Sequence, residues 1–201
     1  MLHHSYISIP SSRPIQIILT SHDATRLATE CPSTTFINSH SRQEINRRTM
    51  DEFGYTHTHS KPCTIALQLT NLVGVNESIA KNLQLRGFKS PTPIQRSTIP
   101  LSLATPPRDV LGMARTGSGK TLAYIIPLLQ RLGMEHRDTT GPRAIIMCPT
   151  RELAIQILKV GKDLARGSKK GKEQEPLRWA IIIGGTSLDS QFESMSNSPD
   201  M

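Results

Sequence analysis

Residues 109–121 read Asp-Val-Leu-Gly-Met-Ala-Arg-Thr-Gly-Ser-Gly-Lys-Thr, and this stretch decides the fold. Its first residues predict a short strand, and the apolar run after Thr121 predicts a helix. A glycine-rich turn between a strand and a helix points backbone N–H groups and the positive end of the helix at a phosphate. The stretch therefore indicates a P-loop for a nucleoside triphosphate. The alternative is a glycine-rich turn that binds nothing. The Gly-Lys-Thr sequence stands between the predicted strand and the predicted helix, where a P-loop requires it, and this disfavours the alternative.

Each residue of this loop has an expected part in binding. Gly117 and Gly119 let the backbone turn around phosphate oxygens, Lys120 reaches the β- and γ-phosphates, and the Thr121 hydroxyl ligates Mg²⁺. The expected nucleotide contacts are Ala114, Arg115, Thr116, Gly117, Ser118, Gly119, Lys120 and Thr121. Lys120 and Thr121 are also the expected catalytic residues. Ala114 stands where the general pattern most often has glycine.

Strands and helices alternate after the loop. The runs 143–148 and 178–183 are nearly continuous in apolar residues, which is typical of strands covered on both faces. Residues 121–132 are apolar almost all round and predict a buried helix, while 152–165 predict an amphipathic one. We therefore expect an α/β fold in which a parallel sheet is flanked by helices.

The composition divides the chain. Of its 201 residues, those at 1–63 hold six of the seven histidines but only one of the 13 glycines, and they show no sustained period of 2 or 3.6. We expect a disordered Ser/Thr/His-rich tail there, and a folded part from residue 64 that consists of a region at 64–96 and the P-loop domain at 97–201. A mitochondrial transit peptide is disfavoured because Asp23 and Glu30 interrupt the segment.

Charge and cysteine usage exclude several classes of protein. The net charge is +8, and +7 of it lies after residue 63. No apolar run approaches the ~18 residues of a membrane-spanning helix, so we expect no membrane partner. The three cysteines lie far apart without metal-ligand spacing, which argues against a zinc site or a disulfide scaffold and for a reduced, intracellular protein.

Motifs on both sides of the P-loop narrow the choice of nucleotide. Gly87-Phe-Lys-Ser-Pro-Thr-Pro-Ile-Gln95 precedes the loop, and the Gln95 carboxamide offers the donor and acceptor pair that complements N7 and N6 of adenine. Phe88 is a second candidate contact of the base, with core packing as the alternative. No guanine-reading Asn-Lys-x-Asp is present, which disfavours a GTPase. Downstream stand Pro149-Thr-Arg-Glu-Leu153 and Gly184-Gly185.

In order and spacing these elements resemble the Q motif, motif I, motif Ia and the GG element of DEAD-box ATP-dependent RNA helicases. The resemblance covers about residues 65–201 and implies a RecA-like P-loop NTPase domain that binds ATP and Mg²⁺, with 64–96 as its Q-motif region. The stretches PTPIQRSTIP, MARTGSGKT and GG…DSQFESM…NSPDM are most similar to the nucleolar members that act in maturation of the large ribosomal subunit.

The resemblance also implies a site for RNA. Thr150, Arg151, Gly184 and Gly185 would face the sugar–phosphate backbone, a contact without base readout, and no DNA partner is expected. Nuclear and nucleolar localisation and pre-ribosomal particles as partners follow from the resemblance alone. Thr70 occupies the position expected for an aromatic that stacks on adenine. Lys169, Lys170 and Lys172 form a basic loop that is more typical of a solvated surface than of an RNA contact.

The family's Asp-Glu-Ala-Asp motif is absent after Thr121, as is a second RecA-like domain. Without that carboxylate the metal site lacks a ligand, so we expect the 201-residue chain itself to be inactive. We also expect the fold to be incomplete at its C-terminal end, which would leave 109–113 as an exposed sheet edge and the chain unstable. Two alternatives stay open: a truncated product of a helicase gene, or a stand-alone module that binds ATP or RNA without turnover.

Overall fold

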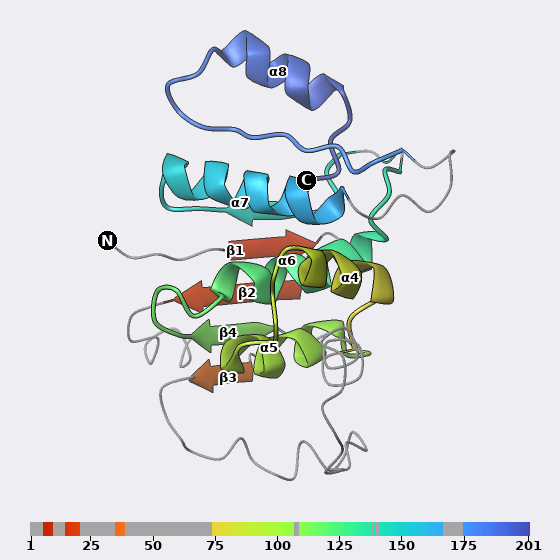
Figure 1. Cartoon of the computed structure of the whole chain (residues 1–201). Helices are drawn as coiled ribbons and strands as arrows, with labels where there is room; N and C mark the ends of the chain where they lie inside the picture. Colours follow the sequence, from red (N-terminus) through yellow and green to blue (C-terminus); the bar gives the residue numbers. More distant parts are fainter. Residues whose placement is uncertain are drawn as a thin grey trace, which may run out of the picture.

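The computed structural model describes residues 74–106, 109–137, 139, 141–166 and 175–201, together with the backbone of three strands nearer the N-terminus. Those strands are β1 (Tyr6–Ile9), β2 (Ile15–Thr20) and β3 (Thr35–Asn38). The remaining elements are, in chain order, α4 (Glu77–Leu85), α5 (Pro93–Leu103), β4 (Val110–Met113), α6 (Lys120–Leu132), β5 (Ile145–Met147), α7 (Arg151–Ala165) and α8 (Leu188–Ser196) (Figure 1).

The strands form one sheet in the order β3-β4-β2-β1-β5. The strand that leads into the P-loop, β4, is parallel to both of its neighbours, and Met113 is in register with Thr20 of β2 and Asn38 of β3. The three strands therefore end at the same edge of the sheet, where the P-loop begins. The strand β1 runs antiparallel to β2 and to β5, so the parallel pairing that the sequence predicts surrounds β4 and does not extend through the whole sheet.

The position of β4 corrects one expectation. The sequence predicts an exposed edge at 109–113, but β4 lies between β2 and β3. Both neighbours come from the first 63 residues, where the sequence analysis finds no strand. The physical reason is that Ile15–Thr20 is a short apolar run inside a Ser/Thr/His-rich segment, and its local pattern does not show that it pairs with a strand about 90 residues further along the chain. The division of the chain at residues 63 and 96 stays a prediction.

A second expectation, a strand at 178–183, is wrong. The segment is extended but belongs to no named strand. Its ordered backbone contacts go to the end of the chain: the Ala180 N–H donates to the Met201 carbonyl at 2.8 Å, and the Asp200 N–H donates to the Arg178 carbonyl at 2.9 Å. Ile182 is 66% exposed. An apolar run forms a strand only where a neighbour supplies the ladder, and within the described residues none pairs with 181–183.

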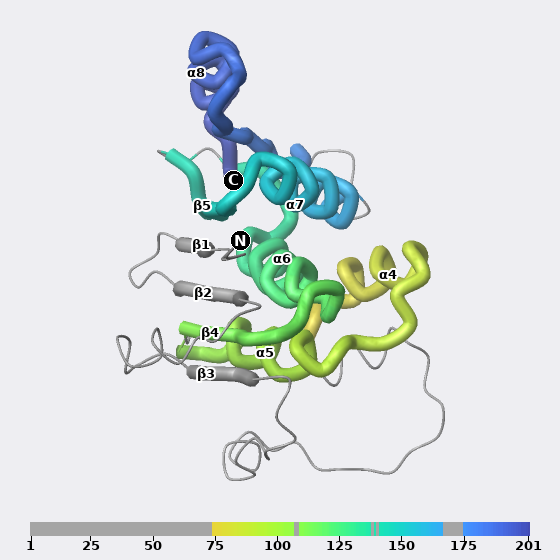
Figure 2. Tube along the Cα trace, turned by 90° about the vertical axis from the view of Figure 1, so that its left-hand side faces the viewer, coloured from red at the N-terminus to blue at the C-terminus, as the bar shows by residue number. Residues whose placement is uncertain are grey.

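The core lies on the P-loop helix. As predicted, α6 is buried on nearly all sides, and Ala123, Ile125 and Leu129 are fully buried. Figure 2 shows α6 between the strands and α4, with α8 standing apart near the C-terminus. None of the residues of α8 is buried. Within the part of the chain that the structure describes, none of the helices is long and apolar enough to cross a bilayer.

Candidate functional site

The P-loop has the geometry that its sequence predicts. The chain leaves β4, turns through residues 116–119 and enters α6 at Lys120, with Gly119 as the N-cap residue. Gly117 and Gly119 have φ angles of 78° and 89°, in the left-handed region that glycine adopts without strain. The unpaired N–H groups and the positive dipole of the first turn of α6 are therefore presented at the loop, which is the arrangement that binds an anion.

Lys120 is folded back over this loop. Its Nζ donates to the carbonyl oxygens of Ala114 at 2.6 Å and of Arg115 at 2.9 Å. Desolvation by burial lowers the pKa of Lys120 from its ordinary value. The ammonium group is thus already positioned at the mouth of the loop, where an anionic ligand has to compete only with neutral carbonyls for its protons.

Gln95 is joined directly to the P-loop. Its Nε2 donates to the Gly119 carbonyl at 3.0 Å, and its Oε1 accepts from the backbone N–H of Thr92 at 3.0 Å. The side chain is only 5% exposed. The carboxamide therefore ties the start of α5 to the loop, and it keeps one further N–H and one lone pair for a ligand. The reading of adenine by Gln95 stays a prediction.

Gly119 is packed so closely that a side chain there would collide with this contact. A Cβ at this position would lie 2.5 Å from Gln95 Nε2 and 3.1 Å from Thr92 Oγ1. A Cβ at Gly117 would meet nothing within 4 Å. The two glycines therefore serve different purposes: Gly117 only provides the turn, whereas Gly119 also provides the space in which the loop meets Gln95.

The donors at the loop fit a nucleotide phosphate. The Ser118 hydroxyl is buried and has no hydrogen-bond partner, a cost that a phosphate oxygen would remove. With Lys120 and the first turn of α6 it makes a donor set suited to an anion. Thr121, the predicted Mg²⁺ ligand, is the second residue of α6 and half-buried. Among the described residues no group of three or more His, Cys, Asp or Glu side chains could hold a metal ion.

Phe88 and Thr70, the positions expected near the base besides Gln95, have different outcomes. Phe88 follows α4 and is 44% exposed, so it is not a core residue, and its contact with the base stays a prediction. Thr70 lies outside the described residues, as do Lys169, Lys170 and Lys172.

The predicted RNA-facing residues come together although they are far apart in the sequence. Thr150 caps α7 as expected, its hydroxyl accepting from the Leu153 N–H at 3.3 Å. Arg151 is exposed, and its guanidinium lies against the glycine pair: a Cβ on Gly185 would be 2.7 Å from Arg151 Nη1. Gly185 has a φ of 89°. Because the glycines have no side chain, the Arg151 guanidinium can approach the turn closely.

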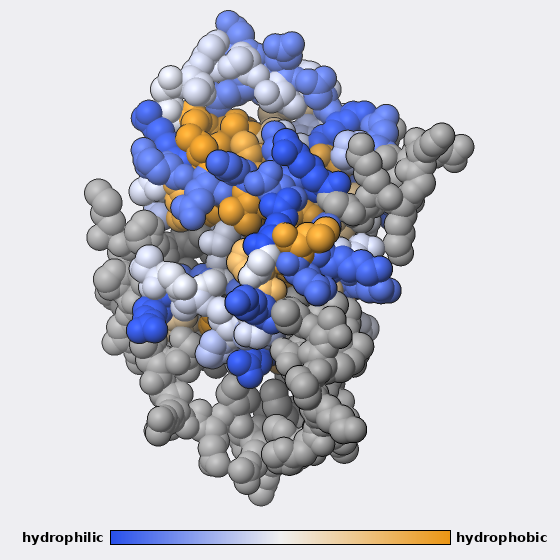
Figure 3. Space-filling view, viewed as in Figure 1, coloured by the Kyte–Doolittle hydropathy of each residue, from blue (hydrophilic) through white to orange (hydrophobic). Residues whose placement is uncertain are grey.

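An apolar groove of about 610 Å³ lies beside these residues, between β5, α7 and the segment 179–184. Figure 3 shows apolar surface between α7 and α8. The exposed apolar side chains of this region include Ile145, Met147, Ile155 and Ile182. The sequence predicts buried strands at 143–148 and 178–183, so the exposure of Ile145, Met147 and Ile182 differs from the expectation.

The sequence profile of DEAD/DEAH box helicases matches residues 92–201, more than half of the chain. The chain belongs to this family. An ATP-dependent RNA helicase DBP10 from Cryptococcus neoformans is 57% identical in an alignment of 145 positions, and the match covers 64% of this chain and 18% of that protein. The DBP10 protein of Mycosarcoma maydis is 56% identical in an alignment of 135 positions, and the match covers 64% of this chain and 12% of the relative. The chain therefore spans less than a fifth of the length of these relatives.

Solved structures agree with this assignment. The RNA helicase Prp28 from Chaetomium thermophilum bound to ADP matches with a TM-score of 0.56 and 31% identity, over 80% of this chain and 39% of that one. The yeast DEAD-box splicing factor Prp28 matches with a TM-score of 0.55 and 29% identity, over 80% of this chain and 38% of the other. These matches establish the RecA-like helicase fold, and the resemblance that the motifs indicated is confirmed.

Proposed function

We propose that this chain is the ATP-binding part of an ATP-dependent RNA helicase. ATP would be held at the P-loop, with Lys120 on the β- and γ-phosphates and Thr121 on Mg²⁺, and Gln95 would read adenine. Bound Mg²⁺ would supply charge neutralisation at the phosphates. The observation that carries the proposal is the hydrogen bond from Gln95 to Gly119, because it fixes the carboxamide at the loop that holds the phosphates.

RNA would bind at the start of α7 and at the glycine pair. Thr150, Arg151, Gly184 and Gly185 offer a hydroxyl, a guanidinium fork and a closely approachable turn, which suit a sugar–phosphate backbone and carry no base readout. The packing of Arg151 against Gly185 supports this assignment. Binding would be independent of RNA sequence and steeply dependent on salt.

The cellular role is a proposal as well. The resemblance to nucleolar helicases of large ribosomal subunit maturation supports action on pre-ribosomal particles, in the nucleus and nucleolus. A stand-alone module that binds ATP or RNA without turnover is the second candidate.

The nucleotide assignment is tested by competition. A fluorescent ATP analogue bound to the full chain should be displaced by ATP at a concentration about tenfold lower than GTP, a preference of ~1.4 kcal/mol. Gln95→Ala should reduce this preference, because the donor and acceptor pair for adenine is lost. Equal displacement by ATP and GTP in the wild type would remove the assignment to adenine.

A further inference from the structure

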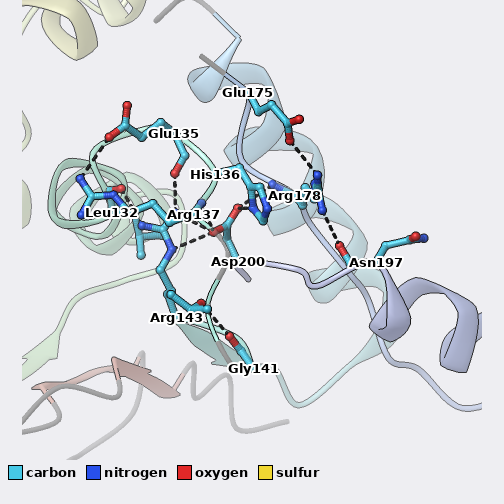
Figure 4. A network of polar contacts seen from close by, with 11 residues as sticks. Leu132, Glu135, His136, Arg137, Gly141, Arg143, Glu175, Arg178, Asn197 and Asp200 are labelled. Atoms are coloured by element: carbon cyan, nitrogen blue, oxygen red, sulfur yellow. Dashed lines mark hydrogen bonds and ion pairs between the residues drawn. The ribbon is translucent and has the colours of Figure 1, made fainter. Parts of the chain in front are cut away.

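Asp200 is the centre of a buried polar network that the sequence analysis did not detect (Figure 4). Its Oδ1 accepts from Arg143 Nε at 2.7 Å, and its Oδ2 accepts from the backbone N–H of Arg178 at 2.9 Å. The ring of His136 places Nδ1 2.9 Å from Oδ2. The Asp200 carbonyl also accepts from the N–H groups of Arg143 and Ala144. One residue thus joins three segments that are distant in the sequence.

The network is closed to solvent and well satisfied. The side chain of Asp200 is fully buried, that of His136 is 4% exposed, and that of Arg143 is 14% exposed. Burial acts to raise the pKa of Asp200, but the hydrogen bonds from Arg178, His136 and Arg143 outweigh it and leave this pKa below its ordinary value. A buried carboxylate with this set of donors is costly to break, because removing one partner leaves a charge or a donor unpaired.

The network is also bonded to the end of α6. Arg143 Nη1 donates to the Leu132 carbonyl at the end of α6 at 3.0 Å, and Nη2 donates to the Glu135 carbonyl. The backbone N–H of His136 donates to the Glu175 carbonyl at 3.0 Å. Asp200 is therefore attached to the end of the P-loop helix, which is the most buried element of the described chain.

The network holds residues 178–180, which begin the segment that leads to Gly184 and Gly185. Residues 178–180 are bonded to Asp200 and Met201, and the next residues, 181–183, have no strand ladder in the described structure. Trp179 packs on Gly161 of α7, where a Cβ would lie 2.2 Å from the ring. The segment is thus fixed at its beginning, and at its end Gly185 lies against Arg151.

We infer that Asp200, with His136 and Arg143, positions the Gly184-Gly185 turn against Arg151 for contact with a nucleic-acid backbone. Asp200 touches no ligand in this assignment and acts only through residues 178–185. The inference rests on the proposed RNA site at Thr150, Arg151 and the glycine pair. It goes beyond that proposal because it assigns a role to Asp200, His136 and Arg143, which are buried and are not among the proposed RNA contacts.

A purely structural role for the network predicts something different. If Asp200 only stabilised the domain, its loss would weaken RNA and nucleotide binding together, in proportion to the unfolded fraction. A positioning role predicts a selective loss of RNA affinity, because the described hydrogen bonds of Gln95 and Lys120 go to Thr92 and the P-loop and not to residues 178–185.

The test uses a matched pair of variants at His136 in the full 201-residue chain. His136→Ala removes the donor to Asp200, whereas His136→Asn keeps a donor near the position of Nδ1. Affinity for a fluorescein-labelled single-stranded oligouridine RNA is measured by anisotropy, and affinity for a fluorescent ATP analogue is measured on the same sample. Asp200→Asn gives the stronger perturbation. Leu83→Ala in α4 serves as a destabilised control with the network intact.

We expect His136→Ala to weaken RNA binding about tenfold and His136→Asn to restore it to within about twofold, with nucleotide affinity unchanged in both. Asp200→Asn should weaken RNA binding further, and Leu83→Ala should leave the ratio of the two affinities at its wild-type value. If Asp200→Asn does not fold, the His136 pair decides alone.

Comparing Arg151→Ala with His136→Ala distinguishes a failure of the positioning role from a failure of the proposed RNA site. If Arg151→Ala weakens RNA binding but His136→Ala does not, or if His136→Ala lowers both affinities equally, the positioning role is wrong and the RNA site stands. If Arg151→Ala leaves RNA affinity unchanged, the proposed RNA site is wrong and the positioning role falls with it.

Discussion

The two candidate sites are built in opposite ways. The nucleotide site is almost continuous in sequence: β4, the turn and α6 follow one another, and Gln95 and the candidate Phe88 come from a segment shortly before them. The RNA-facing site joins the start of α7 to a turn far along the chain, and Asp200 is bonded to Arg178 at the start of the segment that leads to this turn. A site made of one continuous segment depends on local backbone geometry, whereas an assembled site depends on distant packing and buried charge.

The largest expected effect is at the nucleotide site. Gly119→Ala should reduce affinity for the ATP analogue about 100-fold, because a Cβ would combine backbone strain of ~1–2 kcal/mol with a collision against Gln95 Nε2. Gly117→Ala is the matched control, since it has the strain without the collision. It should lose about tenfold. Equal losses in the two variants would show that the contact between Gln95 and the loop contributes nothing.

A smaller effect is expected on the RNA side from Gly161→Ala. The new methyl group would overlap the ring of Trp179, and such overpacking costs ~1–3 kcal/mol. RNA affinity should fall while nucleotide affinity is kept. Titration of both ligands measures this, and adding Trp179→Ala should relieve the overlap, so that the double variant loses less than the sum of the single ones. Additive losses would mean that the two residues do not meet.

The smallest expected effect concerns acid stability. Because the pKa of Asp200 lies below its ordinary value of 3.8 in the folded chain, its contribution to the free energy of unfolding is complete above pH 3.8. It is lost as the pH falls through the lowered pKa. Urea unfolding followed by the fluorescence of Trp179, the single tryptophan, should show wild type and Asp200→Asn converging below pH 3.8. A difference that grows towards low pH would contradict the ionised state of Asp200.

The contrast between a site made of one continuous segment and a site assembled from distant segments also explains which features could be predicted from the sequence. The P-loop, α6 and the cap of α7 by Thr150 follow local rules, and the structure confirms them. The segment 178–183 was misassigned because an apolar run reports burial in a sheet but not whether a neighbouring strand is present. The strands β2 and β3 are not predictable in this way, because each is a short run in a polar segment and its pairing partner β4 lies far along the chain.

The Asp200 network lay beyond sequence reasoning for a different reason. His136, Arg143 and Asp200 are single polar residues at positions with no motif spacing, and only the fold brings them together. Their hydrophilic character predicts exposure, yet the carboxylate of Asp200 is fully buried. A single sequence does not distinguish these buried polar residues from charged residues on the surface.

The central claim is that one chain carries two separable sites, and a crossed pair of variants tests it most directly. Nucleotide and RNA affinities are measured for the full chain, for Lys120→Ala and for Arg151→Ala under one set of conditions. We predict that Lys120→Ala lowers affinity for the ATP analogue at least about tenfold and keeps RNA binding, whereas Arg151→Ala does the reverse. Losses of both ligands together in each variant, or no loss in either, would contradict the claim.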